Sequence, residues 1–539
     1  MINFSKYEKE PNSNSKNEFL TNVENLVKNG EIHFNLEYLD KPKSYSDNLY
    51  ECKTYSEEYY IEEVVDLKES INKLEINKEK KRGFIWKSCK EIFGRDDFVI
   101  LPEKIDYSNF NQGSIGDSYF ISCVNALSQI PQLLNFIMGL TNNNISNDIN
   151  YTNNKKDERK IFTVIFFIDG KWQKILIKDS FPLFESNNKL VGVKPKKNEL
   201  FLMILEKAWA IINGGYDKIE GGYIANIFEL FLGSKCQIFS KNNIYSFHDN
   251  INSFYKSIKE NEKSFGTLSL CGSKGHAYNI LKTLEIYPKG RKEGKYEPCK
   301  FLIISNPHGK NSDLVGSGIE LKQIENILEK KFGKENRIQY EEYLKKNENY
   351  GHNFIYNKNQ IKQSEGTGII YMPLDYYKEW SSHSVLCNPH YDCLSYRCNI
   401  KNELENLYIY KIKLMEKQSF TCQVCFQSYR AHRDKIDEII ISFINKEDKI
   451  NSEFELLLYY TMCGIKIIKN DDNLEEINNY FSKDQKDVSS IKELSLLLDK
   501  GEYFIMIYPE SSINDGVTRF LSEKRIKINL INKIIFKRY

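Results

Sequence analysis

The chain has 539 residues, of which 41% are hydrophobic and 28% charged, and its formal net charge is only +2. The length predicts about two to four domains with real hydrophobic cores. The near balance of charge argues against nucleic acid or an anionic membrane as a bulk electrostatic partner. The longest apolar run, residues 161–168, is far too short to span a bilayer, so we expect no integral membrane segment.

The beginning of the sequence lacks the basic-then-apolar layout of a secretory signal. The 12 cysteines are scattered without metal-type spacing, and the Cys422–Cys425 pair lies in an alternating strand pattern without a second pair nearby. Scattered free thiols fit a reducing compartment. We therefore expect a cytoplasmic protein.

In chain order, residues 1–83 are charged and uneven and form an N-terminal extension that is partly helical. Helical and strand patterns mix from residue 84 onward. After about residue 400, short apolar runs are separated by polar turns at a spacing typical of a β-sandwich. The predicted fold class is therefore α+β, with a mixed core followed by an all-β domain.

Within the core, the segment from Gln112 to Phe120 predicts a tight turn that opens into a buried helix running to about Met138. Ser118 falls in the first turn of this helix, where free backbone N–H groups and the positive end of the helix dipole favour negative charge. A plain Ser/Asp helix cap explains the same pattern.

A hairpin, a helix and two strands are expected around this segment. Asp169-Gly170 joins two alternating apolar stretches and predicts a hairpin. Residues 198–212 have helical spacing. Strands are expected at 276–281 and 301–304, with polar residues at their ends.

Ser118, His276 and Asn306 supply a hydroxyl, an imidazole and an amide. These are the parts of a nucleophile, its base and the group that orients the base. The amide of Gln112 could donate to a developing oxyanion. Taken singly, a histidine after glycine is more often structural, and Asn-Pro is more often a turn.

The order of these motifs resembles the calpain family. Its members have Gln-Gly-x-x-Gly-Asp-Cys-aromatic where this chain has 112–119, Gly-His-Ala-Tyr as at 275–278, and Asn-Pro-aromatic-Gly where this chain has 306–309. Further matches run in the same order to the C-terminal segment 519–523. The resemblance covers roughly residues 84–539. It implies a papain-like protease core at 84–395 with halves at about 84–235 and 236–395, then a calpain-type β-sandwich at 396–539. It also implies calcium-dependent cysteine endopeptidase activity, with an extended peptide or protein substrate in the cleft between the halves.

The clearest departure from the family is Ser118, which stands where the family has its nucleophilic cysteine. A thiol with a reference pKa of about 8.5 is driven to thiolate by a helix N-terminus and an imidazolium. A serine hydroxyl is not ionised by these means and needs precisely aligned base assistance. His308 also replaces the tryptophan that the family places beside its asparagine.

The calcium ligands implied by the resemblance are reduced as well. Hard cations need several oxygen ligands, including carboxylates. At the first family site Asn109 replaces a carboxylate while Glu199 remains, and at the second Thr367 and Ile369 replace two acids. We expect calcium binding to be weak or lost. No EF-hand loop follows the sandwich, so a small-subunit partner is not expected.

Three interpretations stay open. The chain is a pseudoprotease with a peptide-binding or regulatory role, or an active endopeptidase with Ser118 as nucleophile, His276 as base and Asn306 as orienting residue. Alternatively, Ser118 is a substitution introduced to trap a cysteine endopeptidase, although Asn109, His308 and Ile369 would not belong to such a change.

Overall fold

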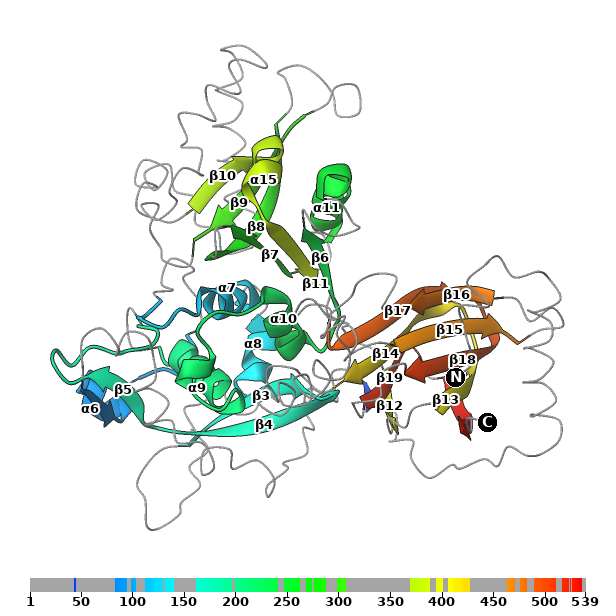
Figure 1. Ribbon diagram of the computed structural model, residues 1–539, viewed down its shortest axis with the longest axis horizontal. Coiled ribbons are helices and arrows are strands. Elements are labelled where there is room, and N and C mark those ends of the chain that lie inside the picture. The colour runs from blue at the N-terminus through cyan, green and yellow to red at the C-terminus, as the bar shows by residue number, and fades with distance from the viewer. Residues whose placement is uncertain are drawn as a thin grey trace, which may run out of the picture.

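The computed structural model describes residues 43–44, 83–94, 98–102, 112–128, 131–139, 161–195, 199–240, 247–261, 268–273, 276–286, 298–306, 369–387, 394–400, 406–426, 463–470, 476–481, 489–509, 516–522, 524 and 526–535. These ranges contain both helices and strands, so the prediction of a mixed helix-and-strand protein is confirmed. Most of the predicted N-terminal extension lies outside them. They fall into a helical part, a six-stranded sheet and a C-terminal pair of sheets (Figure 1).

The helical part is built around one central helix. All ten residues of α7 (Ser118–Leu127) are buried. Around it lie α8 (Pro131–Ile137), α9 (Phe201–Ile212), α10 (Ile224–Leu232) and the hairpin β3 (Ile161–Ile168)–β4 (Lys171–Lys178), which share one hydrophobic cluster. Smaller elements complete this part: β2 (Phe84–Lys87) paired with β5 (Phe181–Phe184), α6 (Cys89–Phe93) and the 3-10 helix η3 (Tyr216–Lys218).

Two sequence predictions meet different outcomes here. The hairpin is confirmed: Asp169 and Gly170 have φ values of 53° and 76°, the positive pair that a type I′ turn requires. The prediction of one helix from Ser118 to about Met138 is wrong. The helix ends at Leu127, and Pro131 begins a second helix, a position where its missing N–H is not needed.

The six-stranded sheet is antiparallel, in the order β10-β9-β8-β7-β11-β6. Its strands are β6 (Cys236–Ser240), β7 (Leu268–Ser273), β8 (His276–Ile286), β9 (Cys299–Ser305), β10 (Ile369–Pro373) and β11 (His383–Cys387). Helices α11 (Phe247–Asn261) and α15 (Leu374–Trp380) pack on it through a separate hydrophobic cluster. The strands predicted at 276–281 and 301–304 are thus confirmed and extended.

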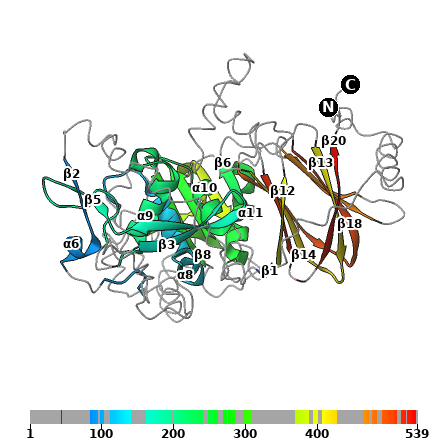
Figure 2. The same ribbon diagram turned by 90° about the horizontal axis from the view of Figure 1, so that it is seen from below.

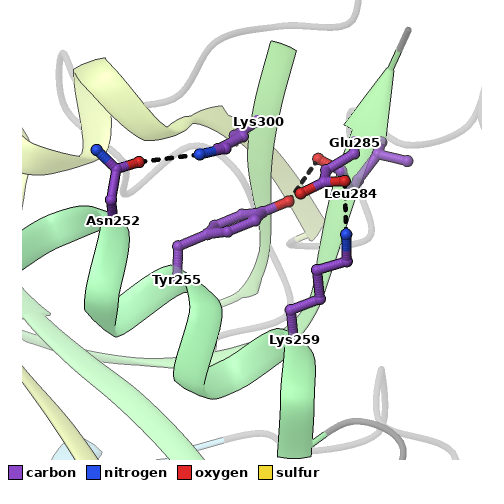
Figure 3. Close-up of polar contacts among 6 residues, drawn as sticks. All are labelled: Asn252, Tyr255, Lys259, Leu284, Glu285 and Lys300. Atoms are coloured by element: carbon purple, nitrogen blue, oxygen red, sulfur yellow. Dashed lines mark hydrogen bonds and ion pairs between the residues drawn. The ribbon is translucent and has the colours of Figure 1, made fainter. Parts of the chain in front are cut away.

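Polar contacts fix α11 to the pair β8–β9 (Figure 3). The Tyr255 hydroxyl donates to the carbonyl of Leu284 at 2.9 Å, and Lys259 pairs with Glu285 at 2.6 Å. The Lys300 ammonium lies 5.7 Å from the centre of the Tyr255 ring. These contacts lie at the end of β8 and the start of β9, so α11 holds the pair of strands at the edge opposite His276 and Asn306.

The C-terminal region consists of two five-stranded antiparallel sheets, β1-β12-β19-β14-β17 and β16-β15-β18-β13-β20. The strands are β1 (Lys43–Ser44), β12 (Leu394–Ile400), β13 (Asn406–Leu414), β14 (Gln418–Phe426), β15 (Cys463–Lys469), β16 (Glu476–Phe481), β17 (Ile491–Leu498), β18 (Gly501–Pro509), β19 (Gly516–Ser522) and β20 (Lys527–Ile535). Side chains from both sheets meet in one hydrophobic cluster. Figure 2 shows the two sheets beside each other, with β12 and β14 nearer the helical part.

Buried polar groups attach this region to the end of α10. The Gly233 carbonyl accepts hydrogen bonds from Gln423 Nε2 at 3.2 Å and from Arg519 Nη1 at 3.0 Å. Arg519 is 2% exposed. One turn earlier, the Glu229 carboxylate accepts from Ser490 Oγ at 2.7 Å. The C-terminal sheets and the helical part are therefore joined by matched polar contacts as well as by apolar packing.

Candidate active site

The loop at residues 112–117 is held by close backbone packing. Ser114 N–H donates to the carbonyl of Val191 at 2.7 Å. A Cβ added to Gly113 would lie 1.8 Å from the carbonyl oxygen of Gly192. Glycine is therefore required at position 113 by space, which explains one of the two glycines of the motif.

Ser118 is the first residue of α7 and is 8% exposed. The carbonyl of Asp117 accepts the N–H groups of Phe120 at 2.8 Å and Ile121 at 3.2 Å, whereas its side chain makes no capping hydrogen bond. The Ser118 hydroxyl thus lies at the positive end of the helix dipole, as the sequence predicted.

Asp117 and Glu206 form a buried pair of carboxyl groups directly before Ser118. Burial raises the pKa of Asp117 to about 7 and raises that of Glu206 well above its ordinary range. The Asp117 carboxyl interacts with the Glu206 carboxyl and with the backbone N–H of Asp117 itself. The two oxygens of Glu206 accept the Val193 N–H at 2.9 and 3.1 Å. The pair therefore holds at least one proton near neutral pH, and it ties the residue before Ser118 to the turn that packs on its loop.

Tyr119 is committed to the core. Its hydroxyl accepts from Trp209 Nε1 at 2.9 Å and donates to the Ile219 carbonyl at 3.0 Å. A Cβ added to Gly222 would lie 2.4 Å from the Tyr119 ring. The residue after Ser118 therefore anchors the helix start to α9 and to the loop before α10.

His276 begins β8 and Asn306 follows β9, and the structure brings them together. His276 Nε2 lies 3.1 Å from Asn306 Oδ1, and Asn306 is 2% exposed. An amide oxygen only accepts, so this contact assigns the proton of a neutral ring to Nε2 and leaves Nδ1 as its basic nitrogen. The ring packs edge-on against Tyr278 at 4.8 Å, and Tyr278 in turn contacts Trp380 at 4.9 Å. The structure thus places the predicted base and its predicted orienting residue within hydrogen-bonding distance of each other.

A hydrogen bond that the sequence did not suggest links the two parts of this site. Ser122 Oγ donates to the carbonyl of Ala277 at 3.0 Å. Ser122 lies one helical turn after Ser118, and Ala277 directly follows His276. The helix that carries the predicted nucleophile is therefore bonded to the strand that carries the predicted base. A serine in the middle of an apolar run was the only available signal.

Gln112 is used within its own loop. Its Nε2 donates to the carbonyl of Ile115 at 2.8 Å. A side-chain amide nitrogen has two hydrogens, so this contact uses one of them. The other remains compatible with the predicted donation to an oxyanion.

Of the residues predicted for calcium, Glu199 is buried and bridges to the main chain of Val99, whereas Asn109 and Thr367 lie outside the described residues, as does His308. Ile369 is described only as the start of β10. Calcium takes about six to eight oxygen ligands. In the described ranges no cluster of three or more His, Cys, Asp or Glu residues is placed to hold a metal ion. Glu199 is thus the one described carboxylate among the predicted calcium ligands, and weak or lost calcium binding stays a prediction.

Cys123 on α7 and the Cys422–Cys425 pair on β14 are buried thiols. Cys123 Sγ donates to the carbonyl of Ile224 at 3.6 Å, and burial raises its pKa well above the ordinary value. Cys422 and Cys425 project to opposite faces of β14 into different clusters, as a spacing of three in a strand requires. Neither arrangement provides a reactive thiolate.

The chain was compared with known proteins. The family model described as "Calpain family cysteine protease" matches residues 63–335, just over half of the chain. The calpain-type cysteine protease ADL1 of Oryza sativa subsp. japonica is 29% identical over 136 residues, which is 25% of this chain and 6% of that protein. The calpain-type cysteine protease DEK1 of Zea mays is 30% identical over 125 residues, 23% of this chain and 5% of the relative. Calpain-8 of Rattus norvegicus is 25% identical over 254 residues, 42% of this chain and 31% of the relative. The matches thus span less than a third of these relatives.

Proposed function

Because the chain belongs to the calpain family of cysteine proteases, we propose that it binds extended peptide segments of proteins and that Ser118 leaves it little or no hydrolytic turnover. The observation that carries this proposal is the His276–Asn306 contact at 3.1 Å, combined with a serine at the start of α7. The base and its orienting residue keep a working geometry, while the group at the nucleophile position lacks an easily ionised thiol.

In this proposal the helical part and the six-stranded sheet are the two lobes of a papain-like core at 84–395. The peptide lies between them. The two C-terminal sheets then form the β-sandwich at 396–539, which the hydrophobic cluster shared by both sheets supports.

The chemistry follows from the positions of the side chains. In a cysteine enzyme His276 would take the thiol proton, and the helix dipole would stabilise the resulting thiolate. With Ser118 the hydroxyl proton has to pass to His276 during attack on the peptide carbonyl, so small errors in alignment cost more. Gln112 would donate to the oxygen that becomes negative.

An active endopeptidase with Ser118 as nucleophile is the second candidate. The intact hydrogen bond between His276 and Asn306 favours it, since a site without chemistry does not need an oriented imidazole.

The test compares the native protein with Ser118→Cys, Ser118→Ala and the double variant Ser118→Cys/His276→Ala on a mixed peptide library, with and without calcium. We expect no hydrolysis by the native protein and clear hydrolysis by Ser118→Cys that His276→Ala abolishes. Native hydrolysis that disappears in Ser118→Ala would establish the second candidate instead. An inactive Ser118→Cys protein that binds none of the peptides would overturn the proposal.

The remaining parts of the proposal concern setting and partners. We place the protein in the cytoplasm, with weak or lost calcium binding and no nucleic-acid partner. Among the described residues, no helix is long and apolar enough to cross a membrane.

A further inference from the structure

The contact between α7 and β8 contains more polar groups than a hydrophobic core needs. We define the α7–β8 seam as Ser122 and Asn125 on the helix and Ala277 and Asn279 on the strand. Ser118, Ser122 and Asn125 are spaced by four and three residues, so they lie on one helix face. Ala277 and Asn279 share one face of β8.

Only part of this polarity is satisfied within the described residues. Asn125 is 1% and Asn279 0% exposed, and neither amide has a hydrogen-bond partner there. Each unpaired buried polar group weakens the contact in which it lies. Ser122 by contrast donates across the seam to Ala277.

The choice of partner by Ser122 is unusual for a serine inside a helix, which commonly bonds the carbonyl four residues earlier. Ser128, the C-cap residue of the same helix, does this, donating to Val124 at 2.8 Å. Ser122 instead reaches another element. Its acceptor, Ala277, lies before the β8–β9 ladder, which begins at the pair Asn279–Ser305.

We infer that Ser122 is a positioning residue that sets the separation between Ser118 and His276 through its hydrogen bond to Ala277. This inference rests on the proposed function. The bond lies one helical turn, about 5–6 Å, from Ser118 and one residue from His276. It therefore fixes the helix against the strand close to the point where a proton would pass, in a seam whose two amides make no bond to another described residue.

The test uses the full chain with Ser118→Cys and does not depend on peptide hydrolysis. The alkylation rate of the introduced thiol by iodoacetamide is measured from about pH 5 to 9 by mass spectrometry of its peptide, because the midpoint reports thiolate formation. We expect a midpoint well below about 8.5. Adding Ser122→Ala should raise the midpoint and slow alkylation at neutral pH about tenfold. Adding Ser128→Ala removes another buried hydrogen bond of the same helix and should leave the midpoint unchanged.

The double variant Ser118→Cys/His276→Ala separates the two ways of failing. If His276→Ala raises the midpoint and Ser122→Ala does not, this inference is overturned and the proposed site stands. If His276→Ala has no effect, the thiol and the imidazole are not coupled, and the proposed site falls together with this inference. Circular dichroism melting curves of every variant establish that the folded protein is being compared.

Discussion

The carboxyl groups of Asp117 and Glu206 face each other in the protein interior, one residue before Ser118. The groups that most affect the pKa of Asp117 include no cation. Glu220 adds a further negative charge. Such a pair is tolerable only while it shares protons. The loop before Ser118 is therefore coupled to the protonation of Glu206 on α9.

This pair predicts a pH dependence of stability. Both acids have folded-state pKa values above their unfolded values, so the native state binds more protons and the free energy of unfolding falls as pH rises from about 4 to about 7 and beyond. Asp117→Asn removes one charge and offers Glu206 an N–H donor. We expect the melting temperature of the variant, relative to the native protein, to rise between pH 5 and pH 8.

Glu502 provides the matched control for this measurement. Hydrogen bonds from Lys411 and Lys413 lower its pKa to about 2, so it stays ionised in both states across that pH range. Glu502→Gln should therefore change the melting temperature equally at both pH values. If the melting temperature of Asp117→Asn relative to the native protein is also the same at both pH values, the two acids do not share a proton.

The second prediction concerns the glycines of the loop. Gly113→Ala places a Cβ 1.8 Å from the carbonyl oxygen of Gly192, so we expect a loss of roughly 3 kcal/mol or more, or failure to fold. Gly116→Ala is the control, since nothing lies within 4 Å of its added Cβ. Thermal melts compare the two, and equal stability would show that the loop is not packed as described.

A third prediction addresses the buried guanidinium. Arg519 donates to Gly233 and to Gln423 Oε1 and lies 5.0 Å from the centre of the Phe167 ring. Arg519→Ala removes both hydrogen bonds and leaves a cavity, while Gly233 keeps only its bond from Gln423, and about 3 kcal/mol of stability should be lost. Lys413→Ala breaks a half-exposed ion pair and should cost less than about 1 kcal/mol. Urea titrations followed by fluorescence test this, and similar midpoints for both variants would refute it.

Calcium supplies the fourth prediction. With Glu199 as the one described carboxylate of the expected site, about 1 mM calcium should shift the melting temperature by less than about 1 °C relative to EGTA. A larger shift that Glu199→Gln abolishes would instead reveal a functional site.

Local chemistry made part of this fold predictable. Asp169-Gly170 predicted its hairpin because the positive φ values are a property of two adjacent residues. By contrast, α11 was not predicted, because the Asn and Lys residues in FHDNINSFYKSIKEN make the segment polar on average although its apolar residues keep helical spacing. Pro131 was the available signal for the break between α7 and α8, because proline is favoured at the first position of a helix.

The residues of the candidate site were also only partly predictable from the sequence. Ser118, His276 and Asn306 stood out because each lies in a short motif. Ser122 did not, because its partner Ala277 is 155 residues away and contributes only a backbone carbonyl. Glu206 could not be predicted as a partner of Asp117. Nothing in the segment LEKAW distinguishes a buried glutamate from an exposed one.

The attachment at Gly233 bears on how this protein can be divided. Helix α10 starts beside the glycine that packs on Tyr119 and ends at a carbonyl whose donors, Gln423 and Arg519, come from the C-terminal sheets. A fragment truncated near residue 395 would lack Gln423 and Arg519, which donate to the Gly233 carbonyl. It would also lack Ser490, which donates to the Glu229 carboxylate. Measurements made on such a fragment would therefore describe a core with an altered α10, rather than the site that the whole chain builds.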